Sequence, residues 1–119
     1  MTPLHVLLVE DEPDLRLLVE DALSHRGIEV TVARNGAEAL ERLRGSGGYS
    51  HVVTDVCMPE GVSGLQVANE ALERHPSVQV IVVSGYQRSQ LPPIPDAMTF
   101  LPKPYRMHQL FAALGAEGA

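Results

Sequence analysis

The segment LHVLLVED, residues 4–11, decides the fold and indicates where a functional site lies. Its first six residues, Leu4–Val9, are apolar apart from His5, which is typical of a strand buried on both faces of a parallel sheet. The carboxylates of Glu10 and Asp11 follow directly. In an open parallel α/β sheet the carboxyl ends of the strands lie along one edge, where ligands bind. We therefore expect Glu10 and Asp11 at such an edge.

Two later charged residues stand in the same relation to an apolar run. Asp55 ends the run HVVTD, and Lys103 follows TFLP. If all these runs are parallel strands of one sheet, residues far apart in the sequence converge on one pocket. Three carboxylates and one lysine can together hold a divalent cation and a phosphoryl group.

Apolar runs alternate with helical patterns along the whole chain. This alternation predicts an α/β fold with a doubly wound parallel sheet and right-handed crossovers, in a single domain spanning residues 1–119. Two helix-start boxes support it, Asn35 with Glu38 and Ser63 with Gln66. The predicted strands are Leu4–Val9, Ile28–Ala33, His51–Asp55, Val78–Val83 and Met98–Leu101. The helices are marked by Pro13 to Gly27 with an apolar stripe of Leu15, Leu18, Val19, Ala22 and Leu23, by Ala37–Leu43, by Ser63 to Pro76, and by Met107, Leu110, Phe111 and Leu114.

One segment interrupts this alternation. Residues 86–95 contain Pro92, Pro93 and Pro95, each of which is incompatible with a helix interior. The fourth helix is therefore expected to be short or absent, with a mobile loop in its place. A flexible turn is expected over residues 45–48, and the tail 115–119 has nothing to pack against.

Composition excludes several classes of function. The net charge is −6 and no run of Lys or Arg occurs, so direct nucleic-acid binding is not expected. A single cysteine, Cys57, rules out an internal disulfide and fits a reducing compartment. The apolar stretch near the N-terminus is too short for a signal peptide or a membrane span. We expect a cytoplasmic domain that makes no membrane contact of its own.

The charged residues suit phosphoryl chemistry on a carboxylate. A carboxylate can act as nucleophile and carry the phosphoryl group as an acyl phosphate, if a divalent cation and a cationic side chain neutralise the charge. Asp11 and Asp55 can supply oxygen ligands to Mg²⁺ directly, Glu10 can act through water, and the backbone carbonyl of Cys57 can add another ligand.

Two further side chains complete the expected phosphoryl site. Ser84 ends the fourth predicted strand, so its hydroxyl can donate a hydrogen bond to a phosphoryl oxygen. Lys103 can pair with another of these oxygens and with the nucleophile. The five histidines show no ligand spacing and none ends a predicted strand, so a histidine phosphodonor must come from another protein or domain.

Four motifs in this order resemble the receiver domain of two-component response regulators, over essentially the whole chain. They are LLVEDE at 7–12, DVCMP at 55–59, VVSGY at 82–86 and FLPKPY at 100–105. The sequences of the last two motifs, together with the proline-rich segment, are most similar to receivers of hybrid sensor histidine kinases. The resemblance implies a flavodoxin-like sheet with strand order 2-1-3-4-5, located in the bacterial cytosol or tethered through a membrane-bound hybrid kinase.

The resemblance also implies individual roles. Asp55 would be the phosphoacceptor, which takes the phosphoryl group from a phosphohistidine on a histidine kinase or a histidine phosphotransfer protein. Glu10 and Asp11 would form the acidic site for Mg²⁺, or Mn²⁺ in its place. Ser84 and Phe100 would be the switch residues.

Further features of the family bear on this chain. The bond before Pro104 would be cis, which proline permits at modest energetic cost. Such a domain catalyses only its own phosphorylation and dephosphorylation. The spacing from Asp55 to Gly64 is one residue longer than is usual in the family. The shortened fourth helix leaves the oligomeric state open.

Two other readings compete with a working receiver. Phosphatases with an aspartyl nucleophile usually carry a second aspartate two residues later, where this chain has Cys57. A pseudo-receiver, which acts as an interaction module independent of phosphorylation, would be favoured by the loss of Asp11, Asp55 or Lys103, and all three are present.

Overall fold

The computed structural model of the chain describes residues 4–45, 48–58 and 61–116. Parts of the glycine-rich turn, the loop after Met58 and the C-terminal tail lie outside these ranges, as does Pro59. Strands and helices alternate along the chain, as predicted from the sequence. The elements are β1 His5–Val9, α1 Pro13–His25, β2 Glu29–Ala33, α2 Gly36–Arg44, β3 His51–Asp55, α3 Gly64–Arg74, β4 Gln79–Ser84, a 3₁₀ turn Arg88–Gln90, β5 Met98–Pro102 and α4 Met107–Leu114.

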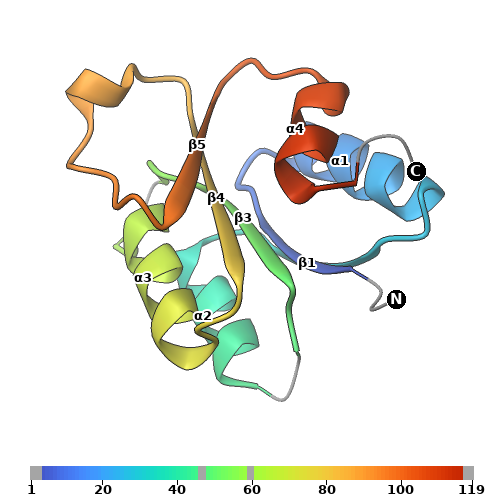
Figure 1. Cartoon of the computed structure of the whole chain (residues 1–119), viewed down its shortest axis with the longest axis horizontal. Coiled ribbons are helices and arrows are strands. Elements are labelled where there is room, and N and C mark those ends of the chain that lie inside the picture. The colour runs from blue at the N-terminus through green and yellow to red at the C-terminus, as the bar shows by residue number, and fades with distance from the viewer. Residues whose placement is uncertain (1–3, 46–47, 59–60, 117–119) are drawn as a thin grey trace.

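The strands form one parallel sheet in the order β2-β1-β3-β4-β5, which confirms the predicted topology. The strand order reverses between β1 and β3, which are adjacent in the sheet. Because every pairing is parallel, the carboxyl ends of β1, β3, β4 and β5 lie along the same edge (Figure 1). A doubly wound sheet binds ligands at this edge, near the point where the strand order reverses.

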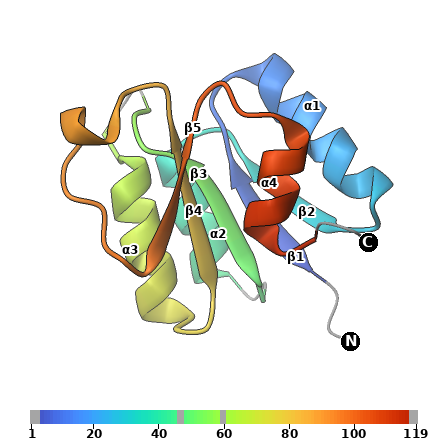
Figure 2. The same ribbon diagram turned by 45° about the horizontal axis from the view of Figure 1, so that its top comes forward.

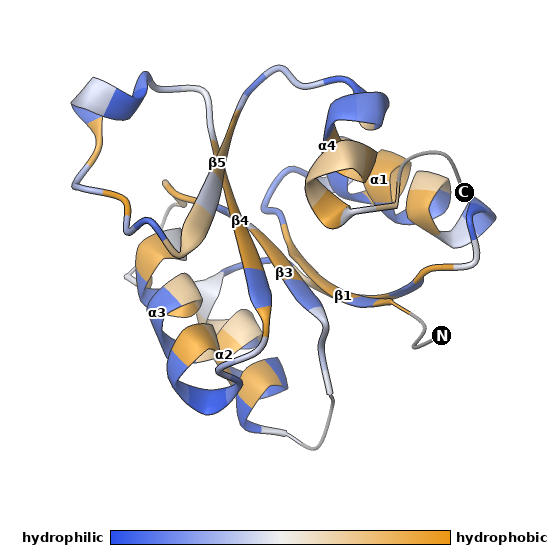
Figure 3. Cartoon of the chain, viewed as in Figure 1, coloured by the Kyte–Doolittle hydropathy of each residue, from blue (hydrophilic) through white to orange (hydrophobic). Residues whose placement is uncertain are grey.

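Helices cover both faces of the sheet. The pair α2 and α3 lies on one face and the pair α1 and α4 on the other, and both views show this layering (Figures 1 and 2). Alternate residues of β1 divide between the two cores: Leu7 packs toward α2 and α3, whereas Leu8 packs toward α1 and α4. This is why the inner strands β1 and β4 are apolar along most of their length (Figure 3). No helix in the described ranges is both long enough and apolar enough to cross a bilayer.

The predicted stripe of α1 is wrong at one position. Val19 and Leu23 are fully buried, but Leu18 is 61% exposed, as is Leu17. At about 100° per residue, Leu18 falls at the margin of the stripe formed by Leu15, Val19 and Leu23. The sheet and α4 cover the centre of this stripe and leave its margin in solvent.

The fourth helix of the predicted pattern is absent apart from the 3₁₀ turn, as the prolines indicated. The segment between β4 and β5 lies beside β5, where it is drawn in orange (Figure 1). Ile94 is buried in the core on the α2–α3 side and Leu91 packs against it, while Pro92 and Pro93 are exposed. Two apolar side chains thus cover a part of the sheet that a helix would otherwise cover.

Gly64 allows α3 to begin against the end of β3. Its amide nitrogen donates a hydrogen bond to the carbonyl oxygen of Val56 at 2.9 Å. A Cβ atom at this position would collide with the carbonyl oxygen of Asp55, which is backbone and cannot rotate away. Because Gly64 has no side chain, α3 can begin in contact with the backbone of Asp55.

We expect Gly64→Ala to lower the free energy of unfolding by about 3 kcal/mol, because the collision forces β3 and α3 apart. Urea denaturation followed by circular dichroism measures this change. Gly48→Ala is the matched control, since a Cβ there meets nothing within 4 Å, and it should shift stability by less than about 1 kcal/mol. Equal effects of the two substitutions would contradict this account.

Candidate functional site

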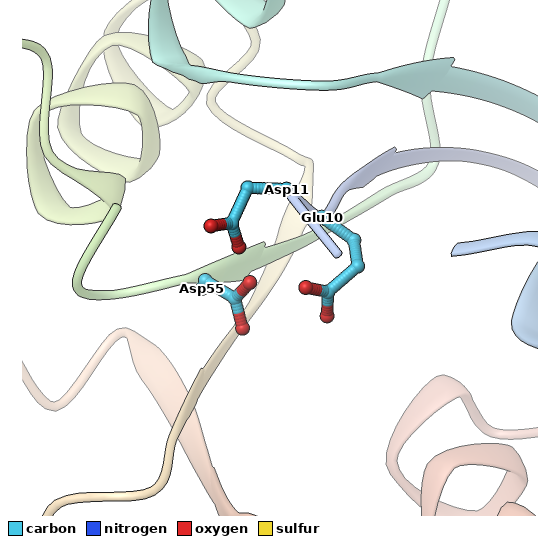
Figure 4. A group of neighbouring side chains, drawn as sticks. All are labelled: Glu10, Asp11 and Asp55. Atoms are coloured by element: carbon cyan, nitrogen blue, oxygen red, sulfur yellow. The ribbon is translucent and has the colours of Figure 1, made fainter. Parts of the chain in front are cut away.

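Three carboxylates meet at the carboxyl edge of the sheet. Glu10 and Asp11 directly follow β1 and Asp55 ends β3, and one oxygen of each lies within 4.8 Å of the others. Figure 4 shows the three side chains converging on one space. Glu10 and Asp55 are buried, at 4% and 5% exposure, whereas Asp11 is exposed. The topology therefore places two charged groups out of water and a third at their side.

Lys103 is the cation of this cluster. It follows β5, and its Nζ lies 2.7 Å from Oδ1 of Asp55 and 3.0 Å from Oε1 of Glu10. Its backbone nitrogen donates a 2.7 Å hydrogen bond to the carbonyl oxygen of Ser84, which ties the lysine to the end of β4. The peptide bond between Lys103 and Pro104 is cis, in agreement with the expectation from the sequence.

A pocket of about 100 Å³ adjoins the cluster. Ser84 lies in its wall, is 4% exposed, and accepts a 3.0 Å hydrogen bond from the backbone nitrogen of Tyr86 at its Oγ. Cys57 is exposed and lines the same pocket. The lining residues in full are Asp11, Asp55, Cys57, Val83, Ser84, Gly85, Tyr86 and Lys103.

Phe100 is not brought into this pocket. It pairs with Val82 in the sheet and packs, partly buried, against the core on the α2–α3 side. That core also contains Ile94 of the segment between β4 and β5. In this structure Phe100 is a core residue that lies close in sequence to the site.

The negative charge of the cluster is only partly compensated. Burial and the neighbouring Glu10 raise the pKa of Asp55 to about 8, and the ammonium group of Lys103 opposes this rise. Oδ2 of Asp55 is buried and has no hydrogen-bond partner among the described residues. Buried polar atoms usually have a partner, so this oxygen indicates a missing ligand. A hard divalent cation with oxygen ligands fits the donor set, and Asp11 is exposed to receive it.

A second cavity beside the cluster could not be predicted from the sequence. Its volume is about 370 Å³ and its surface is mainly apolar, and the residues that line it are Glu12, Leu15, Gly85, Lys103, Pro104 and Tyr105. Burial raises the pKa of Tyr105 to about 12, so this phenol stays neutral. Glu12 and Tyr105 are the last residues of the motifs LLVEDE and FLPKPY. Their nearness in sequence to Asp11 and Lys103 indicates that they lie near the site, but it does not indicate a cavity.

The chain matches the family model described as response regulator receiver domain over residues 6–115. It is 41% identical over 109 residues to the sensor kinase CckA of Brucella abortus, covering 88% of this chain and 11% of that protein. It is 35% identical over 108 residues to the response regulator receiver protein CpdR of the same organism, covering 88% of each. The chain thus spans about a tenth of the first relative and most of the second.

Solved structures show the same fold. A response regulator receiver protein from Sinorhizobium medicae superposes with a TM-score of 0.87 at 32% identity, covering 95% of this chain and 92% of that one. TrrA of Thermotoga maritima, in complex with Mg²⁺ and BeF, gives 0.82 at 31% identity, with coverage of 94% and 96%. A complex of the histidine kinase ThkA with TrrA gives 0.80 at 30% identity, with coverage of 98% and 99%.

The raised pKa of Asp55 predicts how stability depends on pH. The folded state favours the protonated carboxyl group, so this contribution to stability is complete below about pH 3.8 and is lost as the pH rises through about 8. At pH 8.5 without metal, Asp55→Asn should therefore be more stable than the wild type by about 2 kcal/mol, and this difference should shrink toward pH 4.

Urea denaturation in EDTA at both pH values measures the effect. Asp96→Asn makes the same chemical change at an exposed position and should leave the pH dependence as it is in the wild type. If Asp55→Asn and the wild type lose stability in parallel as the pH rises, then ionisation of Asp55 is not the cause of the pH dependence.

Proposed function

Because the chain belongs to the family of response regulator receiver domains, we propose that it accepts a phosphoryl group on Asp55 within a two-component phosphorelay. Membership of this family confirms the resemblance found in the four motifs. The observation that carries the proposal is the buried Oδ2 of Asp55, which has no partner among the described residues and lies beside Lys103 and two further carboxylates. An oxygen in this position is a nucleophile with cationic assistance at hand.

The reaction is a transfer between two side chains. An oxygen of Asp55 attacks the phosphorus of a phosphohistidine, a new O–P bond forms as the N–P bond breaks, and the released imidazole takes a proton from solvent. Lys103 already lies 2.7 Å from the nucleophile and can pair with a phosphoryl oxygen as charge develops. Ser84, in the wall of the same pocket, can donate its hydroxyl to another.

A divalent cation would complete the charge balance. Glu10, Asp11 and Asp55, together with the backbone carbonyl of Cys57, are the groups that would hold Mg²⁺ or Mn²⁺. When bound, the cation supplies positive charge that lowers the repulsion between the carboxylates and the incoming phosphoryl oxygens. The related protein TrrA has been crystallised with Mg²⁺ and BeF, which supports this part of the proposal.

The output would be a shift between two conformations. At present the hydroxyl oxygen of Ser84 accepts a hydrogen bond from the backbone nitrogen of Tyr86. A phosphoryl oxygen on Asp55 that accepts a hydrogen bond from this hydroxyl would draw the hydroxyl toward itself and away from Tyr86. Phe100 lies one strand away, on β5, in the same core cluster as Ile94. Movement of Ser84 and Phe100 would therefore reposition the segment between β4 and β5, which is the surface we propose as the switch.

The phosphodonor would be a histidine kinase or a histidine phosphotransfer protein. No histidine lines the pocket among the residues that the structure describes. A donor must contact the surface around Asp55. The apolar part of this surface is the cavity that Leu15 and Pro104 line. Leu17 and Leu18 are exposed apolar side chains on the same helix, and Leu18 lies one turn after Leu15. The relative TrrA is seen in complex with a histidine kinase.

We propose that residues 1–119 act as one receiver domain in the bacterial cytosol. Its relatives include a sensor kinase of which this chain spans about a tenth and a receiver protein of which it spans most. A cytosolic receiver fits both settings, tethered to a membrane-bound hybrid kinase or separate from it. Neither DNA binding nor membrane contact by this domain is part of the proposal.

Incubation with acetyl phosphate tests the acceptor directly. Intact mass should increase by one phosphoryl group with Mg²⁺ and stay unchanged in EDTA, and Asp55→Asn should show no adduct. Asp96→Asn, which alters an exposed aspartate, is the matched control and should be labelled like the wild type.

Normal acyl-phosphate formation on Asp55→Asn would defeat the assignment of the acceptor. If the wild type shows no adduct, Mg²⁺ titration and beryllofluoride binding are the next tests, because small donors do not label every receiver. Failure of all three would favour the pseudo-receiver reading.

The docking surface can be tested separately from the chemistry. The double substitution Leu17→Ser and Leu18→Ser should lower the ratio of labelling by a phosphorylated histidine protein to labelling by acetyl phosphate, by about tenfold, because two exposed anchors are lost. Phosphorylation rates from both donors, followed by gel electrophoresis or mass, give this ratio. Asn69→Ser on the opposite face of the sheet should not change it. An unchanged ratio in the double variant would place the docking surface elsewhere.

A further inference from the structure

Cys57 has a position that neither packing nor the proposed transfer explains. It is the only cysteine of the chain, and its side chain is exposed although free cysteines are among the most buried residues. It lies two residues beyond Asp55 and lines the same pocket of about 100 Å³. The transfer uses at most its backbone carbonyl, so the exposed thiol has no assigned task.

The pocket that Cys57 lines has the properties of an incomplete ligand site. Asp55 is 5% exposed, and its Oδ2 has no hydrogen-bond partner among the described residues. Ser84 and Lys103 line the pocket as well. It is much smaller than the neighbouring cavity of about 370 Å³. A phosphoryl group bound to Asp55 and a group attached to Cys57 would therefore compete for one small space.

We propose that Cys57 is a site of reversible thiol–disulfide modification that controls whether Asp55 can accept a phosphoryl group. The inference rests on the proposed function and adds regulation to the same site. The co-reactant is a low-molecular-weight disulfide. The thiolate of Cys57 attacks one sulfur, a new S–S bond forms while the old one breaks, and the released thiolate takes a proton from water.

Two physical effects make the adduct inhibitory. A peptide-sized group such as glutathione is larger than the pocket, so part of it covers the entrance. Glutathione also carries a net negative charge, which it would add beside Glu10, Asp11 and Asp55, where one lysine is the counter-charge. Both effects oppose the approach of an anionic phosphodonor.

The coupling must also operate in the opposite direction. If the Cys57 adduct excludes the phosphoryl group because both need the same small pocket, then a phosphoryl mimic on Asp55 occupies the space beside the thiol and must slow its modification. This second readout uses the unmodified wild-type protein. It stays valid even if the glutathione adduct disturbs the fold.

The first experiment compares acetyl-phosphate labelling before and after treatment with oxidised glutathione, with Mg²⁺ present and with intact mass as the readout. The mixed disulfide should reduce the labelling rate of wild type at least tenfold, and dithiothreitol should restore it. Cys57→Ser, compared with its own untreated sample, should show no effect of treatment. Labelling of the adduct within twofold of the untreated wild type would overturn the proposal, as would equal inhibition of Cys57→Ser.

The second experiment follows the reaction of Cys57 with Ellman's reagent. Beryllofluoride with Mg²⁺ should slow it at least fivefold relative to Mg²⁺ alone, and an unchanged rate would contradict the inference. The untreated wild type separates this inference from the function on which it rests. If that sample is labelled on Asp55 and modification has no effect, the thiol switch alone fails, whereas if it binds neither phosphoryl group nor beryllofluoride, both proposals fail.

Discussion

Two buried carboxylates share one ammonium group at the carboxyl edge of the sheet, and the geometry of the site depends on this contact. Lys103 lies within 3.0 Å of both Glu10 and Asp55, so it joins the ends of β1, β3 and β5. Burying charge is costly, and one cation offsets two buried anions only in part. The remaining imbalance appears in the raised pKa of Asp55 and in its Oδ2, which has no hydrogen-bond partner in the part of the chain that the structure describes. A site with these properties favours the binding of positive charge.

Apolar packing on both faces of the sheet offsets the free-energy cost of burying these charged groups. The central strands β1, β3 and β4 are almost fully buried, and two separate cores pack against the two faces of the sheet. Gly64 adds a local constraint, because α3 can approach the backbone of Asp55 only where no side chain stands between them. The segment between β4 and β5 is held more lightly, by Leu91 and Ile94, and it begins beside Ser84.

The same pocket carries both proposals made for this chain. Phosphoryl acceptance uses its buried carboxylate, and thiol modification uses the exposed side chain two residues later. Their proximity follows from their positions, because Cys57 stands two residues after Asp55 at the carboxyl end of β3. A change at either group would therefore be detected at the other without a conformational relay.

The sequence by itself determined the layered fold and the composition of the site. Apolar runs predict strands buried on both faces. The predicted box of Ser63 with Gln66 is observed at the start of α3. Asn35 caps α2 as predicted, but the carboxylate of Glu38 accepts from the backbone nitrogen of Arg34, so that box is not closed. Topology then places residues that follow parallel strands at a common edge, which is why Glu10, Asp11, Asp55 and Lys103 could be grouped without coordinates. The absence of a regular fourth helix followed from Pro92, Pro93 and Pro95, because proline does not fit a helix interior.

Only the tertiary structure decided the features that depend on distances between elements. The exposure of Leu18 depends on how far the sheet and α4 extend around α1, and periodicity carries no such information. The cavity beside Tyr105 and the contact of Gly64 with Asp55 arise from the approach of separate elements. Phe100 stands three residues before Lys103, yet it packs into the core, because alternate residues of a strand face opposite sides of the sheet. Residue types and order define what can meet at an edge, whereas packing defines which atoms remain without a partner.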